Sequence, residues 1–313
     1  MSPTILAATW SDGLFAFSGD ACHRELEGQS VSGLTSDRRG GALAIADGHS
    51  ICRRVPGGEW KTIATSGYPL ACCVAVENMI YAGTDGARVL RVVASGDIEG
   101  LVGFESVPGR DTWYPGTAVI SGQVLGPPLG IRSITATADG AVLLANVHVG
   151  GIPRSKDGGN TWQATIDIES DVHEVCAHPV HPEIVVAAAA IGLCVSRDSG
   201  ATWTVETEGL HALYCSAVAF VGNDVLVAAS TDHFAAQGAV YRRSINGKHP
   251  LTRVGGGFPA WTDGIVDTGC IASGADVIAI ADKRGNVYVS ADAGDSWSPR
   301  ATGLPDVSSI FVV

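Results

Sequence analysis

The apolar residues of this chain fall into short runs that are separated by glycine and other turn-forming residues. Residues 5–8 and 14–17 near the N-terminus and residues 307–313 at the C-terminus are three such runs. Short apolar runs with turn residues on both sides predict β-strands. The chain has 313 residues and 40 glycines, so we expect one all-β domain, residues 1–313, with many tight turns.

The runs recur in units of four short strands, with a period of about 40 residues. The first strands of the complete units are expected to begin near Val31, Leu70, Ile131, Val172, Ala212 and Thr268. Residues 4–27 offer three further strands without a first one, and residues 307–313 match the first strands. Pairing the two ends would make a seventh unit and close the units into a ring without an open edge.

An eight-residue pattern, S-x-D-x-G-x-T/S-W, occurs three times, at residues 155–162, 196–203 and 290–297. An Asp side chain can hydrogen-bond the backbone of a tight turn, Gly supplies a positive φ, and Trp can pack under a neighbouring strand. Each copy therefore predicts a turn between two strands. Asp157, Asp198 and Asp292 are assigned a structural role and no catalytic one.

This pattern resembles the Asp box of the Asp-box (BNR repeat) β-propeller family, and more broadly the sialidase, WD40- and YVTN-like repeat proteins. The resemblance implies a seven-bladed β-propeller of four-stranded blades, closed by the C-terminal strand beside the N-terminal blade. It also implies sialidase-like glycoside hydrolysis as one candidate activity. The arginine motif that such enzymes carry is missing, since the nearest string is Gly151-Ile152-Pro153-Arg154, in the wrong order.

Three insertions interrupt the period, at residues 108–130, 233–238 and 255–267. They fall between one blade and the next, or between the second and third strands of a blade. In a propeller both loop types lie on the same face, here called the top face, and the Asp-box turns lie on the bottom face. Loops on a rigid scaffold commonly carry function, so we expect the functional site on the top face.

Four histidines are expected on adjacent top-face loops of blades four to six: His148, His173, His211 and His233. Neutral imidazoles suit a divalent transition metal such as Zn, Fe, Cu or Ni, and an open position on such a metal can activate water. Asp171 and Asp232 lie close to two of these histidines in the sequence, as further ligands or orienting groups. The alternative is that the histidines cap strand ends and bond loop carbonyls.

Further polar and aromatic residues are expected on the same face. Arg132 begins a first strand and joins Asp171 and Asp232 as a candidate catalytic residue. Aromatic rings around a concave opening are suited to stacking on a flat ligand or a sugar. The candidate substrate-binding residues are Trp10, His49, Tyr68, Trp113, Tyr114, Trp261 and Asp267. For Trp113 and Trp261, the alternative is that they anchor their own long loops.

The formal net charge of −12 argues against nucleic acid or an anionic membrane as partner, because both require a basic surface. The N-terminus has no basic segment followed by an apolar one, which favours a cytoplasmic location. A monomer acting on a small-molecule substrate is expected. The leading hypothesis is a metal-dependent hydrolase or lyase; the alternative is a non-catalytic propeller that binds a glycan or protein through the same face.

Overall fold

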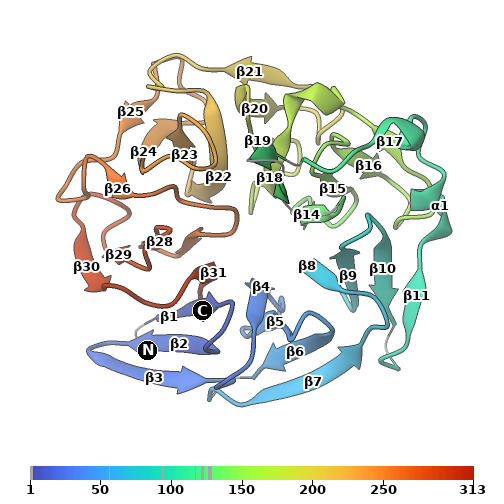
Figure 1. Cartoon of the computed structure of the whole chain (residues 1–313), viewed down its shortest axis with the longest axis horizontal. Helices are drawn as coiled ribbons and strands as arrows, with labels where there is room; N and C mark the ends of the chain where they lie inside the picture. The colour runs from blue at the N-terminus through green and yellow to red at the C-terminus, as the bar shows by residue number, and fades with distance from the viewer. Residues whose placement is uncertain (1–2, 56, 94, 117, 121–122, 126–128) are drawn as a thin grey trace.

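The computed structural model describes residues 3–55, 57–93, 95–116, 118–120, 123–125 and 129–313. They form a ring of seven antiparallel blades around a central axis, each with four strands running from the axis outward (Figure 1). The prediction of a seven-bladed, all-β propeller is therefore confirmed. None of the described helices is long and apolar enough to cross a membrane.

The strands of each blade follow from the axis outward. Blade one holds β31 (Val307–Val312), β1 (Thr4–Thr9), β2 (Leu14–Ser18) and β3 (Ala21–Glu25). Blade two holds β4 (Val31–Ser36), β5 (Ala42–Ala46), β6 (Ser50–Arg54) and β7 (Trp60–Thr65). Blade three holds β8 (Leu70–Val76), β9 (Met79–Thr84), β10 (Val89–Val92) and β11 (Ile98–Gly100). Blade four holds β14 (Ile131–Ala136), β15 (Leu143–Val147), β16 (Pro153–Ser155) and β17 (Gln163–Ala164).

The remaining three blades follow the same order. Blade five holds β18 (Val172–Ala177), β19 (Val185–Ala189), β20 (Gly192–Ser196) and β21 (Thr204–Glu206). Blade six holds β22 (Tyr214–Val221), β23 (Asp224–Ser230), β24 (Gln237–Ser244) and β25 (Thr252–Arg253), and the short strand β26 (Thr262–Asp263) also pairs with β24. Blade seven holds β27 (Ile271–Gly274), β28 (Val277–Ala281), β29 (Val287–Ser290) and β30 (Ser298–Ala301).

The long connection between blades three and four contains the short helix α1 (Val102–Glu105), the 3₁₀ turn η1 (Arg110–Thr112) and the strand pair β12 (Ala118–Ile120) and β13 (Gln123–Leu125). A second 3₁₀ turn, η2 (Ile168–Ser170), leads into blade five. Four of the predicted first strands begin where expected. The other two begin later, at Tyr214 and Ile271, because the residues before them are used in turns.

The ring closes as predicted, because the last strand of the chain pairs with the first. β31 lies antiparallel to β1, and Ile5 faces Val312 while Ala7 faces Ile310. Residues from opposite ends of the chain thus share one blade, and the two termini lie close together in Figure 1. Pairing of this kind leaves blade one without an unpaired inner edge.

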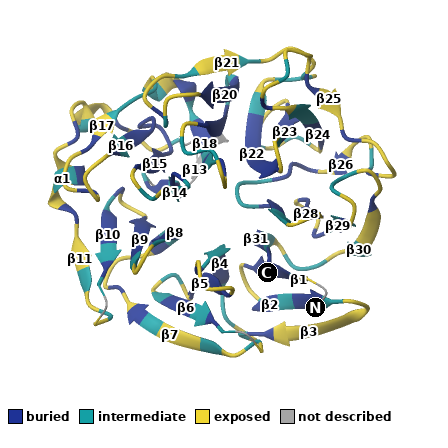
Figure 2. Cartoon of the chain, turned by 180° about the vertical axis from the view of Figure 1, so that it is seen from behind, coloured by how far each residue is buried: buried dark blue, intermediate teal, exposed yellow. Residues whose placement is uncertain are grey.

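The second strands of the blades are buried on both sides. Every residue of β5, β15, β19 and β28 is buried, and alanine recurs in all four. A blade is covered by a neighbour on each face, so its central strands have no solvent side, and small residues allow close approach of the sheets. The outermost strands show the opposite pattern, with exposed residues along β3 and β30 (Figure 2).

The three predicted boxes form nearly identical turns on the bottom face. In the first, the Ser155 hydroxyl donates to Asp157 Oδ1 over 2.8 Å, and the Gly159 N–H donates to the Ser155 hydroxyl over 2.9 Å. The backbone and hydroxyl of Thr161 donate to the two oxygens of Asp157. These bonds lower the pKa of Asp157 to about 2, and the Asp157 carboxylate is therefore a turn-organising group.

Trp162, the last residue of the first box, should be important for stability. Its indole is only 6% exposed and packs edge to face on Phe104. Trp162→Ala is expected to lower the free energy of unfolding by roughly 3–5 kcal/mol, measured by denaturant titration, because it leaves a large cavity. Trp10→Ala is the matched control: Trp10 is 57% exposed, so its loss should cost less than about 0.5 kcal/mol. Equal stabilities of the two variants would contradict this assignment.

Candidate metal centre

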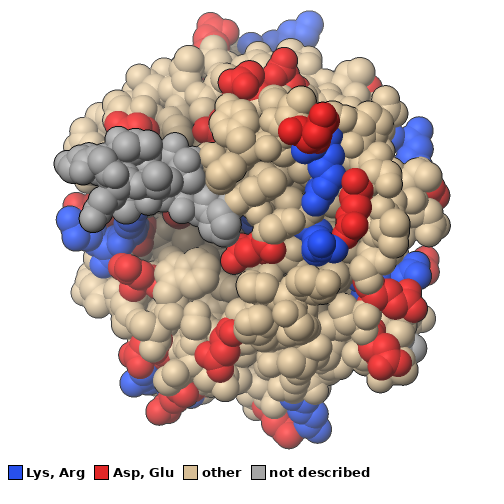
Figure 3. All heavy atoms as spheres, turned by 45° about the vertical axis from the view of Figure 1, so that its right-hand side comes forward, with Lys and Arg blue, Asp and Glu red and all other residues tan. Residues whose placement is uncertain are grey.

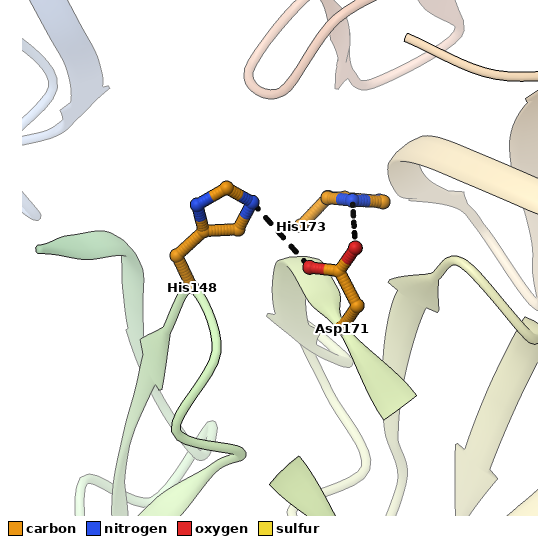
Figure 4. Close-up of side chains that lie close together, drawn as sticks. All are labelled: His148, Asp171 and His173. Atoms are coloured by element: carbon orange, nitrogen blue, oxygen red, sulfur yellow. Dashed lines mark ion pairs between the residues drawn. The ribbon is translucent and has the colours of Figure 1, made fainter. Parts of the chain in front are cut away.

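Three side chains from blades four and five meet on the top face: His148, Asp171 and His173 (Figure 4). His148 follows β15, where the chain turns toward β16, and the other two lie at the start of β18. One possible ligand atom from each residue lies within 4.8 Å of the others. Both imidazoles are buried, and Asp171 is partly exposed. The group therefore has the size and composition of a metal site with one accessible side.

A β-bulge aims His173 at this group. In the pairing of β18 with β19, Val172 faces Ala189 and Glu174 faces Ala188, so His173 has no partner across the strand. An extra residue of this kind bends the strand and redirects its own side chain. The position of His173 thus follows from the backbone of the innermost strand.

The same irregularity occurs at the top end of other innermost strands. In β14, Ile131 faces Val147 and Ser133 faces Asn146, which leaves Arg132 as the extra residue. The corresponding residues are Ala71 in β8 and Ser216 in β22. The scaffold therefore offers one redirected side chain in each of these four blades. Blades four and five place a charged group and a metal-binding group there.

Asp171 reaches the two histidines through an unusual backbone conformation. It ends η2 with φ 47° and ψ 73°, in the left-handed region, which Asp tolerates better than most residues. Its Oδ1 lies 3.4 Å from His148 Nε2, and its Oδ2 lies 3.6 Å from His173 Nε2. The carboxylate thus stands between the two imidazoles, as Figure 4 shows.

Hydrogen bonding leaves an electrostatic conflict within the group. His173 Nδ1 lies 2.6 Å from the Cys215 carbonyl oxygen and must donate to it, so a neutral His173 has an acceptor at Nε2. That acceptor faces an acidic oxygen of Asp171. His173 Nε2, Asp171 Oδ1 and His148 Nδ1 are buried and have no hydrogen-bond partner among the described residues. A proton on His173 or a shared cation would remove the conflict.

The charge state of the site at neutral pH suits metal binding. Burial, assisted by the positive charge of Arg132, lowers the pKa of His148 to about 4. Burial would raise the pKa of Asp171, but His173, His148 and Arg132 together hold it below its ordinary value. A neutral imidazole and an ionised carboxylate are the forms that ligate metals, so His148 and Asp171 need not lose protons first.

The insertion between blades three and four covers one side of His148. Gly116 lies against the imidazole, and a Cβ at this position would clash with ring atoms. The Tyr114 N–H donates to the Val149 carbonyl, and the Tyr114 hydroxyl reaches Glu169 over 3.3 Å. The loop is thus fastened to blade four and to η2, and only Gly fits beside the imidazole.

The sequence analysis missed Tyr214, which lies beside His173, and the buried Glu174, which follows His173 in β18. The ring of Tyr214 lies 4.4 Å from that of His173, and burial raises the pKa of its phenol well above the ordinary value. Glu174 accepts hydrogen bonds from the backbone N–H groups of Val218 and Gly269, in the two following blades. Desolvation raises its pKa to about 8. Glu174 could have been found in the sequence, because it is a charged residue within the otherwise largely apolar strand VHEVCA.

The structure does not bring together all four histidines of the sequence prediction. His211 Nδ1 bonds the Tyr241 hydroxyl over 2.7 Å, and its ring packs edge to face on Trp261. His233 also lies outside the three-residue group, with its ring against Phe234. The three-residue group therefore contains two of the four predicted histidines together with Asp171, while Tyr241 and Trp261 hold the His211 ring.

The other candidate catalytic residues have different surroundings. Asp232 accepts a hydrogen bond from the Phe234 N–H and so organises its own turn. Arg132 Nη2 lies 3.9 Å from Asp267 Oδ1, and the charge of Arg132 acts on both His148 and Asp171. Arg132 and Asp267 therefore lie near the histidine group, whereas the Asp232 carboxylate is occupied by its own loop.

The aromatic candidates divide into buried and exposed residues. Trp113 is buried against Phe104 and Arg110, so it anchors its own loop and cannot stack on a ligand as proposed. The exposed ones are Trp10, Tyr68, Tyr114 and Trp261. They lie in connections between blades or between second and third strands, which share the top face. The remaining candidate, His49, bonds the Ser66 carbonyl.

Charged side chains are scattered over the described surface. On the side drawn in Figure 3, acidic and basic groups are interspersed, and no continuous basic area is visible among the residues shown in colour. Many of these charges form local pairs, for example Arg88 with Glu105. The exclusion of polyanionic partners stays a prediction from the net charge.

Comparison with known proteins identifies the fold. No family model matches the chain, and no curated protein matches it. Among solved structures it is similar to the GH74 enzyme of Niastella koreensis, with a TM-score of 0.61 and 13% identity over 94% of this chain and 46% of that one. It is also similar to the GH74 xyloglucanase of Xanthomonas campestris, with a TM-score of 0.60 and 17% identity over 95% and 46%.

A third similar structure is the computationally designed Ika8 protein, with a TM-score of 0.57 and 14% identity over 99% of this chain and 90% of that one. The chain spans less than half the length of the two GH74 proteins. At these identities the likeness establishes the propeller architecture, and any chemistry must be argued from the site itself.

The pKa of His148 predicts how the metal-free protein responds to acid. An unfolded histidine titrates near pH 6.5, whereas His148 in the folded chain titrates near 4. Between these values the unfolded chain binds more protons, so stability is retained above pH about 6.5 and falls as the pH drops toward 4. Urea titrations in EDTA should show a shallower decline for His148→Asn, whereas exposed His49→Asn should follow the wild type. Parallel curves for all three proteins would contradict the assignment.

Proposed function

We propose that this protein is a divalent-metal-dependent hydrolase or lyase that acts on a small organic substrate at the top face. The observation that carries the proposal is the group of His148, Asp171 and His173, with buried acceptors that have no partner among the described residues. Each unsatisfied buried polar atom costs about 1–3 kcal/mol, against a total stability of about 5–15 kcal/mol for an ordinary domain. An ion shared by the group would offset that cost.

The donor set favours zinc or iron. Two imidazoles and one carboxylate occur in catalytic zinc sites that keep an open position, and also in iron(II) sites. Zinc fits hydrolysis or elimination better, because neither reaction changes the oxidation state of the metal. A bound divalent ion would supply Lewis acidity and lower the pKa of a coordinated water.

The chain's own residues have complementary roles in this proposal. The Cys215 carbonyl holds the His173 ring in one tautomer, which directs Nε2 toward Asp171. Arg132 supplies a fixed positive charge beside the group and can orient an anionic substrate group or stabilise developing negative charge. Gly116 and its loop limit access of water from the side of His148. The exposed aromatic residues Trp10, Tyr68, Tyr114 and Trp261 offer surfaces on which an organic substrate can rest.

Glycoside hydrolysis is less well supported. A glycosidase of the common type needs two carboxyl groups on opposite sides of the scissile bond. Here Asp171 faces two imidazoles, and both oxygens of Glu174 accept backbone N–H groups. The GH74 neighbours share only the fold with this chain, at low identity. The metal hypothesis rests on a specific group of side chains, His148, Asp171 and His173.

Zinc titration by calorimetry, after removal of metal with a chelator, tests the site. The wild type should bind one ion per chain. His173→Ala and Asp171→Ala should weaken binding by more than about 100-fold, because loss even of an outer partner of a ligand costs 10- to 100-fold. Melting temperatures of the metal-free proteins establish that the variants are folded.

Two control variants separate this site from the rest of the histidines. His181→Ala removes a partly exposed ring on the bottom face, and His211→Ala removes the ring held by Tyr241. Both should bind zinc like the wild type. Unchanged zinc affinity in His173→Ala, or a large loss in His211→Ala, would contradict the assigned ligands.

Turnover of an activated ester, p-nitrophenyl acetate, and of a small lactone tests the catalytic part of the proposal. Hydrolysis should require added zinc and should fall to the metal-free rate in Asp171→Ala. Stoichiometric zinc binding without zinc-dependent turnover of either probe would instead support a non-catalytic propeller that binds its partner through the top face.

A further inference from the structure

A pocket with a volume of about 520 Å³ lies between blades two and three, away from the histidine group. It is lined by residues from both blades, among them Arg39, Arg53, Ile63, Asn78, Ile80 and Val92. Arg39 and Asn78 lie in turns that join first to second strands, and Ser95 and Gly96 lie in the turn between β10 and β11. Turns of both types belong to the bottom face, so the pocket opens opposite the candidate metal centre.

The turn of blade three beside this pocket lacks the tryptophan that the box turns carry. In blades four and seven the tryptophan that follows the box glycine by three positions fills the space beside the preceding blade, with Trp162 on Phe104 and Trp297 on Phe258. Gly96 of blade three likewise lies beside the preceding blade, at the Ile63 carbonyl. The turn at Gly96 has the same backbone hydrogen bonds as the turn at Gly58 of blade two, where Trp60 follows two positions later; the residue in that place in blade three is Ile98. Ile98 packs with the pocket-lining Ile63, Ile80 and Val92, so a smaller side chain takes the place of the indole.

The pocket combines a cationic rim with an apolar floor. Arg53 Nε is buried and has no hydrogen-bond partner among the described residues, and the carboxylate of Asp37 is 3.7 Å away. The Asp37 atom that faces Arg53 Nε is Oδ2, whereas Oδ1 accepts from the backbone N–H groups of Arg39 and Gly41. Because Nε is buried and the Arg53 side chain as a whole is 25% exposed, an oxyanion in the pocket would meet the outer nitrogens of the guanidinium.

The second guanidinium leaves room for the same ligand. Arg39 Nη2 donates to Asn78 Oδ1 over 2.9 Å, and the other N–H groups of its fork have no hydrogen-bond partner among the described residues. Ile63, Ile80 and Val92 supply the apolar surface between the two blades. Two arginines line the pocket and Asp37 lies beside one of them, so the local charge is positive in a chain with a net charge of −12.

We propose that this inter-blade pocket binds an organic anion with an apolar body and a single carboxylate, sulfonate or phosphate group. The acidic group contacts Arg53 and Arg39, and the apolar body lies against Ile63, Ile80 and Val92. The volume falls within the range of about 300–1,000 Å³ that is usual for small-molecule sites. This site is independent of the proposed metal-dependent activity, because the two lie on opposite faces.

Fluorescence titration with 8-anilinonaphthalene-1-sulfonate, an aromatic ring system with one sulfonate, tests the proposal. The wild type should bind one probe per chain. Arg53→Gln should weaken binding at least about 10-fold, whereas Arg53→Lys should weaken it less, because the positive charge remains. The neutral N-phenyl-1-naphthylamine should bind the wild type and Arg53→Gln equally.

Ser95→Trp provides a second test, because Ser95 is an exposed turn residue whose replacement should fill the pocket without disturbing the core. This variant should lose both probes and retain the wild-type melting temperature. His173→Ala should bind both probes normally. Wild-type binding of the sulfonate probe by both Arg53→Gln and Ser95→Trp would overturn the proposal, as would the absence of a one-to-one complex with the wild type.

Discussion

The structure depends on one packing constraint: each blade must bury both faces against its neighbours around a closed ring. The second strands meet this constraint with small and branched residues, as in VVAAA of β19 and VIAIA of β28. Such sheets have little freedom to shift, because a protein interior is packed nearly as densely as an organic crystal. The top ends of the innermost strands are consequently held in fixed positions, and the bulges there aim single side chains out of the ladder. Arg132 and His173 occupy two of these positions in adjacent blades.

The same constraint explains the contrast between the two faces. On the bottom face, the polar groups of each box form hydrogen bonds within the same turn, and the box tryptophans pack between neighbouring blades. The turn of blade three carries Ile98 in place of a tryptophan, and a pocket lined by Arg53 lies between blades two and three. On the top face, the connections vary in length, and the insertions between blades three and four and between blades six and seven place aromatic and polar side chains around the opening. The residues of the top-face loops and of the bottom-face turns can therefore change without a change in the packing of the ring.

The sequence was sufficient for the architecture but only partly sufficient for the site. The period, the boxes and the unmatched end segments predicted the blade order and the pairing of β1 with β31, because strand patterns and turns are local features. The top-face location of His148, Asp171 and His173 also followed from loop types. The sequence did not predict that His211 lies outside the group, because this depends on a hydrogen bond to the Tyr241 hydroxyl 30 residues away. The bulge at His173 and the proximity of Tyr214 likewise arise from contacts between strands, which no local pattern records. The burial of Trp113 arises from packing on Phe104 and Arg110 within its own loop.

The central claim is that His148, Asp171 and His173 share one divalent ion. Crystals grown with zinc and measured on both sides of the zinc absorption edge test it most directly. The account predicts an anomalous peak about 2.0–2.2 Å from His173 Nε2, a ring nitrogen of His148 and an oxygen of Asp171. A crystal grown with zinc that shows no peak at this position, and in which His173 is hydrogen-bonded directly to Asp171, would show that a proton holds the group together and would contradict the metal assignment.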